Sequence, residues 1–113
     1  MPLILGLDGD GNPVEFYVQG PGPTIDFSGA IAADGVSQPA AVANPNRAYL
    51  TFQNRGANVM YVSDVGDAGD PAAEPSSFTV APGQSWPPPG YPIPLTQINV
   101  SGTAGDGYLY REA

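Results

Sequence analysis

Carboxylate side chains are the groups in this sequence whose types and spacing are best suited to chemistry. Asp64, Asp67, Asp70 and Glu74 fall in one segment, and carboxylate oxygens are the ligands that calcium prefers in proteins. The same spacing, with Gly and Ala between the acids, is also typical of an acidic surface loop. We therefore expect a solvated loop that needs no calcium.

The "DGDGNP" segment offers a second calcium candidate. Asp8, Asp10 and Asn12 alternate as in the first half of an EF-hand loop, but Gly11 precedes Asn12 instead of following it and no Glu stands at the closing position. Asp, Asn and Gly are also the residues that a tight turn requires. We expect such a turn to join two short strands, over residues 3–7 and 14–18, and to need no calcium.

The composition argues against catalysis. The chain has no His, Cys or Lys, so a general base or nucleophile would have to be Asp, Glu, Ser, Thr or Tyr. The sequence contains no phosphate-cradling loop and no nucleophile elbow. We expect a protein that is not an enzyme, with no catalytic residue, no cofactor and no metal site.

The charge balance restricts the partners. Eleven acidic residues face three arginines, which gives a net charge of −8. This charge opposes binding to nucleic acid or to an anionic membrane, and it suits a protein displayed on an outer surface. The N-terminal "MPLILGLDGD" has no basic region and no cleavage signal, so we expect no signal peptide.

Glycine and proline divide the chain into two parts. There are 15 Gly and 14 Pro in 113 residues, and the segment 20–46 has no apolar period of either 2 or 3.6 residues. Such a segment buries too little to offset the cost of ordering its backbone. We expect residues 1–46 to form a hairpin followed by an extended arm that lies against a partner, and residues 47–113 to form a compact β domain.

Residues 47–66 show the most regular pattern, and they predict a β-hairpin around the turn "NRGAN". Ala48, Leu50 and Phe52 alternate with polar or aromatic residues, so we expect this apolar set to face the core. Arg47 should then lie near the edge of the domain, beside the arm.

Further short strands complete the predicted domain. "SFTVAPGQSW" predicts two strands joined by a turn at Pro82–Gly83, and residues 96–101 and 108–111 predict two more. Frequent turns between short strands are typical of a small antiparallel β-sandwich or barrel. The fold class is therefore all-β, with an extended N-terminal arm.

The order of these motifs resembles a small β domain that recurs in the virion proteins of tailed bacteriophages. The resemblance covers residues 47–112, a little over half of the chain. Its marker residues are Arg47, Leu50, Gln53, Asn54, Tyr61, Gly66, Pro82, Gly83, Ile98, Val100, Gly102 and the acidic Glu112.

The resemblance implies a structural role on the outside of a virion. Such domains are similar to capsid decoration (cement) proteins, which implies the major capsid protein as partner and a homo-oligomer, a trimer or else a dimer. It carries over no catalytic residues, and we expect no nucleic acid or membrane partner. We expect the interface to use apolar and proline residues of the arm together with two later aromatics: Tyr17, Pro21, Pro23, Ile25, Phe27, Ile31, Val36, Trp86 and Tyr91.

Two other functions remain open on the sequence. A tail or head-fibre module that binds a host receptor or glycan would display its tyrosines and Trp86 on one face. A metal-dependent enzyme would use the acidic loop 64–74.

Overall fold

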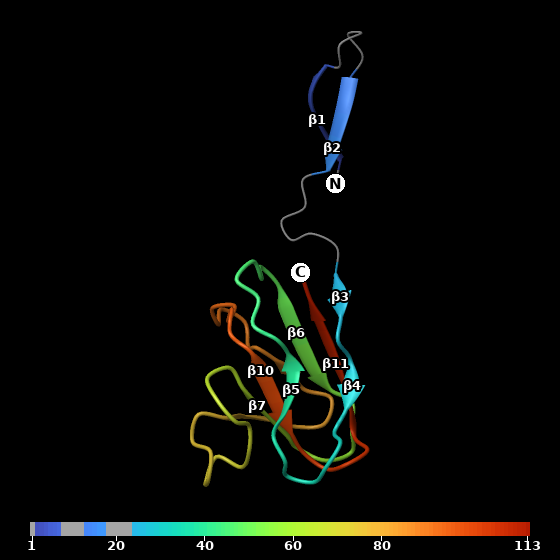
Figure 1. Cartoon of the computed structure of the whole chain (residues 1–113). Coiled ribbons are helices and arrows are strands. Elements are labelled where there is room, and N and C mark those ends of the chain that lie inside the picture. The colour runs from blue at the N-terminus through green and yellow to red at the C-terminus, as the bar shows by residue number, and fades with distance from the viewer. Residues whose placement is uncertain (1, 8–12, 18–23) are drawn as a thin grey trace.

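All the regular structure is β-strand in the part of the chain that the computed structural model describes, residues 2–7, 13–17 and 24–113 (Figure 1). This part contains no helix that is long and apolar enough to cross a membrane. The strands are, in chain order, β1 (Pro2–Leu7), β2 (Pro13–Tyr17), β3 (Ile25–Asp26), β4 (Gly29–Ala30), β5 (Gln38–Ala41), β6 (Leu50–Asn54), β7 (Met60–Ser63), β8 (Phe78–Val80), β9 (Ser85–Trp86), β10 (Ile98–Ser101) and β11 (Gly107–Glu112).

Two antiparallel sheets pack face to face and form a β-sandwich, as the sequence predicted. One sheet has the order β5-β10-β7-β8. The other has the order β3-β11-β6-β9, and β4 also pairs with β11. β1 and β2 pair with each other in the antiparallel hairpin expected for the N-terminal residues. The turn between them lies outside the described residues.

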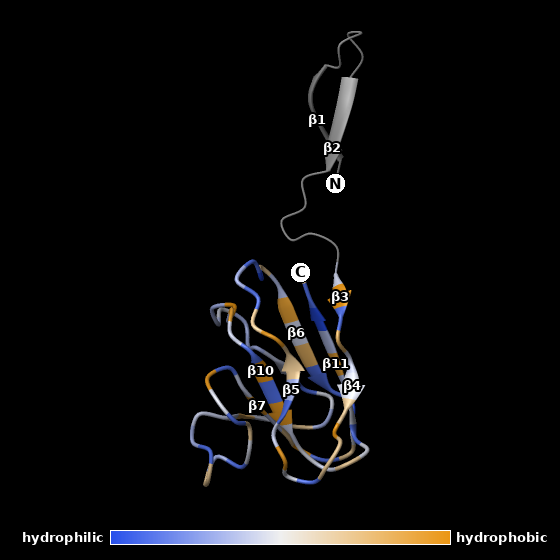
Figure 2. Ribbon diagram, viewed as in Figure 1, coloured by the Kyte–Doolittle hydropathy of each residue, from blue (hydrophilic) through white to orange (hydrophobic). Residues whose placement is uncertain are grey.

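The core lies between the two sheets and follows from the alternation along each strand. In β6, Leu50, Phe52 and Asn54 are buried while the residues between them are half-buried. Figure 2 shows the same alternation as bands of hydrophobic residues along β6. The prediction for Leu50 and Phe52 is confirmed, but Ala48 is exposed because it precedes the strand and its alternation. The largest fully buried apolar side chains are Tyr110, Phe52, Met60, Ile98, Val62, Val80 and Val100.

β6 and β7 do not form the predicted hairpin. β6 pairs with β11 and β9, whereas β7 pairs with β10 and β8, so the "NRGAN" segment crosses from one sheet to the other. The segment between β8 and β9 crosses in the same way, although its predicted turn at Pro82–Gly83 is present. A period of two shows which side chains share a face of a strand. It cannot distinguish a hairpin from an arch between sheets, because both connections bury the same apolar residues.

Asn54 holds these two arches together. Its fully buried side-chain amide donates hydrogen bonds to the carbonyls of Asn58 and Val80, at 2.8 and 2.9 Å. Its side-chain oxygen accepts from the N–H of Gly56 at 2.8 Å, and its backbone carbonyl accepts from Gly83. One side chain thus satisfies backbone groups at both crossings.

The segment between residues 24 and 46 is part of the sandwich, which corrects the predicted boundary at residue 47. β3 and β4 pair with β11, and β5 pairs with β10. Ile31, Ala40 and Ala41 belong to the hydrophobic core. Short edge strands are held by backbone hydrogen bonds on one side only, so they need few large apolar residues and show no strong sequence pattern.

The loop between β7 and β8 covers the outer face of β10. All four residues of β10 are therefore buried, although only Ile98 and Val100 face the core between the sheets. The side-chain amide of Asn99 donates to the carbonyl of Gly66 at 2.6 Å, which fixes the loop against the strand. Ala68, a residue of this loop, is buried.

Candidate functional site

Three residues of the predicted interface are exposed. Ile25, Phe27 and Val36 have exposed fractions of 48, 39 and 57%. Ile25 lies on β3, the edge strand of its sheet, and the backbone N–H of Phe27 donates to the carbonyl of Tyr110. Their side chains are available to a partner.

Two residues of the predicted interface are instead in the core. Ile31 is 2% exposed and Trp86 is 3% exposed, so neither can contact a partner. Both lie in the hydrophobic core because the sandwich begins before residue 47 and because β9 pairs with β6. Of the other candidates, Tyr91 is half-buried, and Pro21, Pro23 and the side chain of Tyr17 lie outside the described part.

The aromatic residues near Trp86 pack against one another. Ring centroids of Trp86 lie 5.5 Å from Phe78 and 5.8 Å from Tyr91, and Phe78 meets Tyr91 edge-on at 5.4 Å. Such contacts stabilise a core, whereas a glycan-binding face needs exposed rings. The arrangement does not favour the receptor- or glycan-binding alternative.

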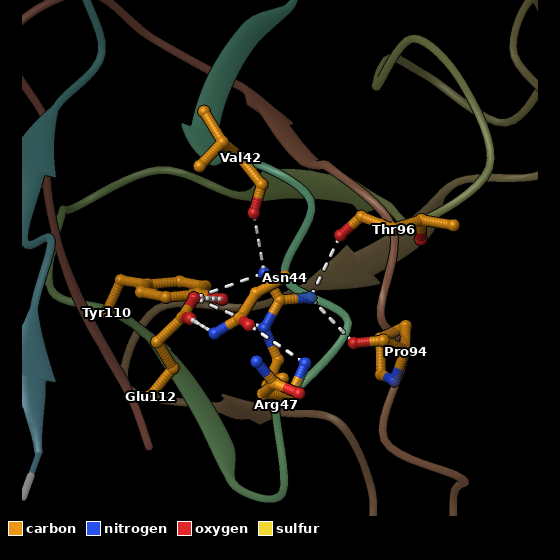
Figure 3. A network of polar contacts seen from close by, with 8 residues as sticks. Val42, Asn44, Arg47, Pro94, Thr96, Tyr110 and Glu112 are labelled. Atoms are coloured by element: carbon orange, nitrogen blue, oxygen red, sulfur yellow. Dashed lines mark hydrogen bonds and ion pairs between the residues drawn. The ribbon is translucent and has the colours of Figure 1, made fainter.

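A buried ion pair closes one end of the sandwich (Figure 3). Nη2 of Arg47 lies 3.1 Å from Oε1 of Glu112, with side-chain exposures of 0 and 3%. Nη1 donates to the carbonyls of Pro94 and Thr96 at 2.6 and 2.9 Å, and Nη2 also donates to the carbonyl of Val42 at 2.8 Å. With Nε bonded to Glu112, the guanidinium donates four hydrogen bonds, and Nη2 also lies at ion-pair distance from the carboxylate.

The carboxylate of Glu112 is equally well satisfied. Oε2 accepts from the side-chain amide of Asn44 at 2.7 Å, and Oε1 accepts from the hydroxyl of Tyr110 at 2.8 Å. Burial alone would raise the pKa of Glu112, but the hydrogen bonds from Asn44, Tyr110 and Arg47 and the charge of Arg47 hold it below its ordinary value. Burial, and then the bond to Glu112, raise the pKa of the Tyr110 hydroxyl.

The geometry makes this cluster structural. A guanidinium and a carboxylate with every hydrogen-bonding group occupied have no free position for a substrate. The sequence placed Arg47 near the domain edge, yet it is buried, because the chain around β5 and the loop before β10 supply three carbonyls around its guanidinium. Its pairing with Glu112 was missed. The available signal was that Glu112 shares the inward face of β11 with Tyr108 and Tyr110.

Exposed apolar side chains surround this same end of the molecule. We call the group the apolar end; its members, with exposed fractions of 48, 66, 39 and 46%, are Ile25, Val42, Tyr49 and Leu95. Ile25 pairs with Glu112 across β3 and β11, and Tyr49 exchanges backbone hydrogen bonds with Ala113. Figure 1 shows β3 and the C-terminus at this end.

The other two members reach the apolar end from the opposite sheet and its loops. The carbonyl of Val42 accepts from Arg47, as Figure 3 shows. The carbonyl of Leu95 accepts from the backbone N–H of Asn44, and its neighbours in the chain bind the same guanidinium. The backbones of these four segments thus lie near one ion pair, and each carries one exposed apolar side chain.

The acidic loop is only partly solvated. Asp67 and Asp70 are exposed, as predicted, but Asp64 is only 8% exposed and accepts a hydrogen bond from the hydroxyl of Tyr91 at 2.9 Å. Burial, and then the bond and charge of Asp64, raise the pKa of Tyr91. Within residues 24–113 and the described strands before them, no three acidic side chains are close enough to hold one metal ion.

We compared the chain with known proteins and found no match. No family model matches the chain, and no curated protein or solved structure matches it.

Proposed function

We propose that this protein is a structural virion protein of a tailed bacteriophage, a decoration (cement) protein that stabilises the head shell from outside. The apolar end is the observation that carries the proposal. Four exposed apolar residues lie at one end of a small sandwich whose other large apolar residues are mostly in its core. Grouped exposed apolar residues mark interaction surfaces, whereas single ones need no explanation.

The marker residues of the resemblance support a binding role for the surface. Arg47, Asn54 and Glu112 act inside the fold, where they close one end and clasp two arches. Because these residues maintain the sandwich, a protein with the same markers can change its surface freely. Function then resides on the exposed surface, where the apolar end holds four of the seven exposed large apolar residues among the described residues.

The proposed partners are the major capsid protein and further copies of this chain. Contacts at symmetry-related positions on a shell act together, so a modest apolar contact in each copy gives a much tighter overall hold. A closed trimer fits the three-fold positions of an isometric shell. Sedimentation velocity on the purified protein should therefore give a trimer, and a stable monomer at micromolar concentration would count against this arrangement.

The location is tested by immunogold electron microscopy of phage particles that contain the protein. We expect label over the head, on intact and on DNA-free particles. Label restricted to the tail or its fibres would overturn the decoration role and favour the receptor-binding alternative.

The role of the apolar end is tested by adding the purified protein back to shells that lack it. We expect Ile25→Asp/Leu95→Asp to reduce the shell-bound fraction in a co-sedimentation assay by about tenfold or more, since each charge enters an apolar contact. The matched control, Ala57→Asp/Val65→Asp, changes two exposed apolar residues that belong neither to the apolar end nor to the predicted interface. Equal binding by the two double variants would show that the apolar end is not the contact.

A further inference from the structure

An acidic cavity lies on the outer face of the β5-β10-β7-β8 sheet, away from the apolar end. Its volume is about 620 Å³, and the β7–β8 loop forms one wall. Four acidic residues, Asp34, Asp67, Asp70 and Glu74, are among the residues that line it, together with Ser101 of β10. None of the three arginines of the chain is among the residues that line it.

Ser101 supplies an independent sign that the cavity receives a ligand. Ile98 and Val100 of β10 point into the core, so the alternation of the strand turns Ser101 to the outer face, where the cavity lies. Its hydroxyl is fully buried and has no hydrogen-bond partner. A buried polar group without a partner costs free energy, and a bound ligand would satisfy it.

The spread of the carboxylates indicates the kind of cation. No three acidic groups among the described residues are close enough to hold one metal ion. A guanidinium group, by contrast, has five N–H donors on a rigid plane and can bind several separated acceptors at once. An exposed arginine on a protein segment therefore matches the negative charge of this cavity and the separation of its acceptors.

We propose that this cavity binds an arginine side chain presented by an exposed segment of a partner protein. The Ser101 hydroxyl oxygen accepts one hydrogen bond from the guanidinium, and the carboxylates at the rim accept others. The site does not depend on the virion role, because it lies on a different face and uses different residues.

The probe is a short blocked peptide, acetyl-Gly-Arg-Gly-Arg-Gly-amide, titrated into ¹⁵N-labelled full-length protein and followed by two-dimensional NMR. The comparison peptide carries citrulline in place of arginine, which keeps the shape and removes the charge. Calcium chloride is titrated separately. We expect shift changes from the arginine peptide in residues 34–37, 67–74 and 101–103, and none from the citrulline peptide.

Three variants locate the binding. Asp67→Asn/Glu74→Gln should weaken the peptide by about fivefold or more, because two nearby charges are lost. The matched control Asp26→Asn/Asp106→Asn removes the same charge from residues that do not line the cavity, and should bind within about twofold of the natural protein. Ser101→Ala should weaken binding by about threefold without lowering the melting temperature, because the lost hydroxyl has no partner in the free protein.

Each contrary result overturns the proposal. Equal weakening by the two double variants would mean attraction to the overall negative charge and not to a site. Unchanged binding in Ser101→Ala would show that the guanidinium does not bind the buried hydroxyl, and the proposed site would then be wrong. Calcium that causes the same shifts at low millimolar concentration and displaces the peptide would show a metal site instead.

Discussion

At the residue scale, the most informative pair is Arg47 and Glu112. Burying one charge is costly, but here each guanidinium nitrogen and both carboxylate oxygens have partners. The pair joins the chain before β6 to the end of β11, so it closes the sandwich at the apolar end. We therefore expect loss of the pair to lower the free energy of unfolding.

Arg47→Met tests the closing role. The variant leaves the Glu112 carboxylate buried without its counter-charge and three carbonyls without their donor. We expect the free energy of unfolding, measured by urea denaturation, to fall by about 3–5 kcal/mol. Arg111→Met is the control, because Arg111 is exposed and should cost less than about 0.5 kcal/mol. Similar losses in both variants would contradict a special role for Arg47.

Glu112 should also make stability depend on pH. Its pKa is lowered from an ordinary value of 4.5 in the folded protein, so the unfolded chain binds the proton more tightly. The stabilisation is therefore fully present above about pH 4.5 and is lost as the pH falls through the lower folded value. Urea midpoints measured between pH 3 and 7 should show this decline in the natural protein. Glu112→Gln should be less stable at neutral pH and should show a smaller decline below pH 4.5. If its decline is the same, Glu112 is not the titrating group.

At the scale of elements, the sequence predicts strands well and their partners poorly. The alternation around Leu50 and Phe52 correctly gave the buried face of β6. It could not tell a hairpin from an arch, since both bury the same side chains and differ only in backbone pairing. β3, β4 and β5 were missed because edge strands rely on backbone bonds, which leave little trace in side-chain pattern. Two residues of the predicted interface, Ile25 and Phe27, were chosen for their apolar character and are exposed. Trp86 was chosen in the same way but is buried, because its burial depends on strands far away in the sequence.

Asn54→Ala tests whether the arches depend on their shared clasp. The variant leaves the carbonyls of Asn58 and Val80 and the N–H of Gly56 without their side-chain partner. We expect a loss of about 2–4 kcal/mol in the free energy of unfolding. Gln53→Ala, the adjacent position on the opposite face of β6, should cost much less. A small effect of Asn54→Ala, comparable with that of Gln53→Ala, would mean that water replaces the clasp.

At the scale of the whole molecule, the sandwich begins near residue 24. Residues 25–41 provide three strands and part of the core, so they are as much a part of the fold as the regular strands after residue 47. The apolar end and the acidic cavity then lie on one stable body, at separate places. If both proposed sites bind, the two partners would occupy separate places on this body.

Two truncations test this extent. Removal of residues 1–23 should leave the thermal unfolding transition and the dispersed NMR spectrum of the sandwich intact. Removal of residues 1–46 should abolish cooperative unfolding, because it takes away β3, β4 and β5 and exposes β10 and β11 along their edges. A shorter chain, 47–113, that still unfolds cooperatively at the same temperature would restore the boundary at residue 47.

The place of β11 in its sheet bears on how the chain acquires its structure. β11 pairs with β3, β4 and β6. Because β11 is the last strand to be synthesised, the first strands of the sandwich cannot pair with it until the chain is almost complete. Arches between sheets also leave few neighbouring strands that can pair early, and folding that depends on distant pairings is slow. In a ribosome-bound chain that ends before residue 107, β3 and β4 therefore have no strand to pair with, and we expect such incomplete chains to be prone to aggregation.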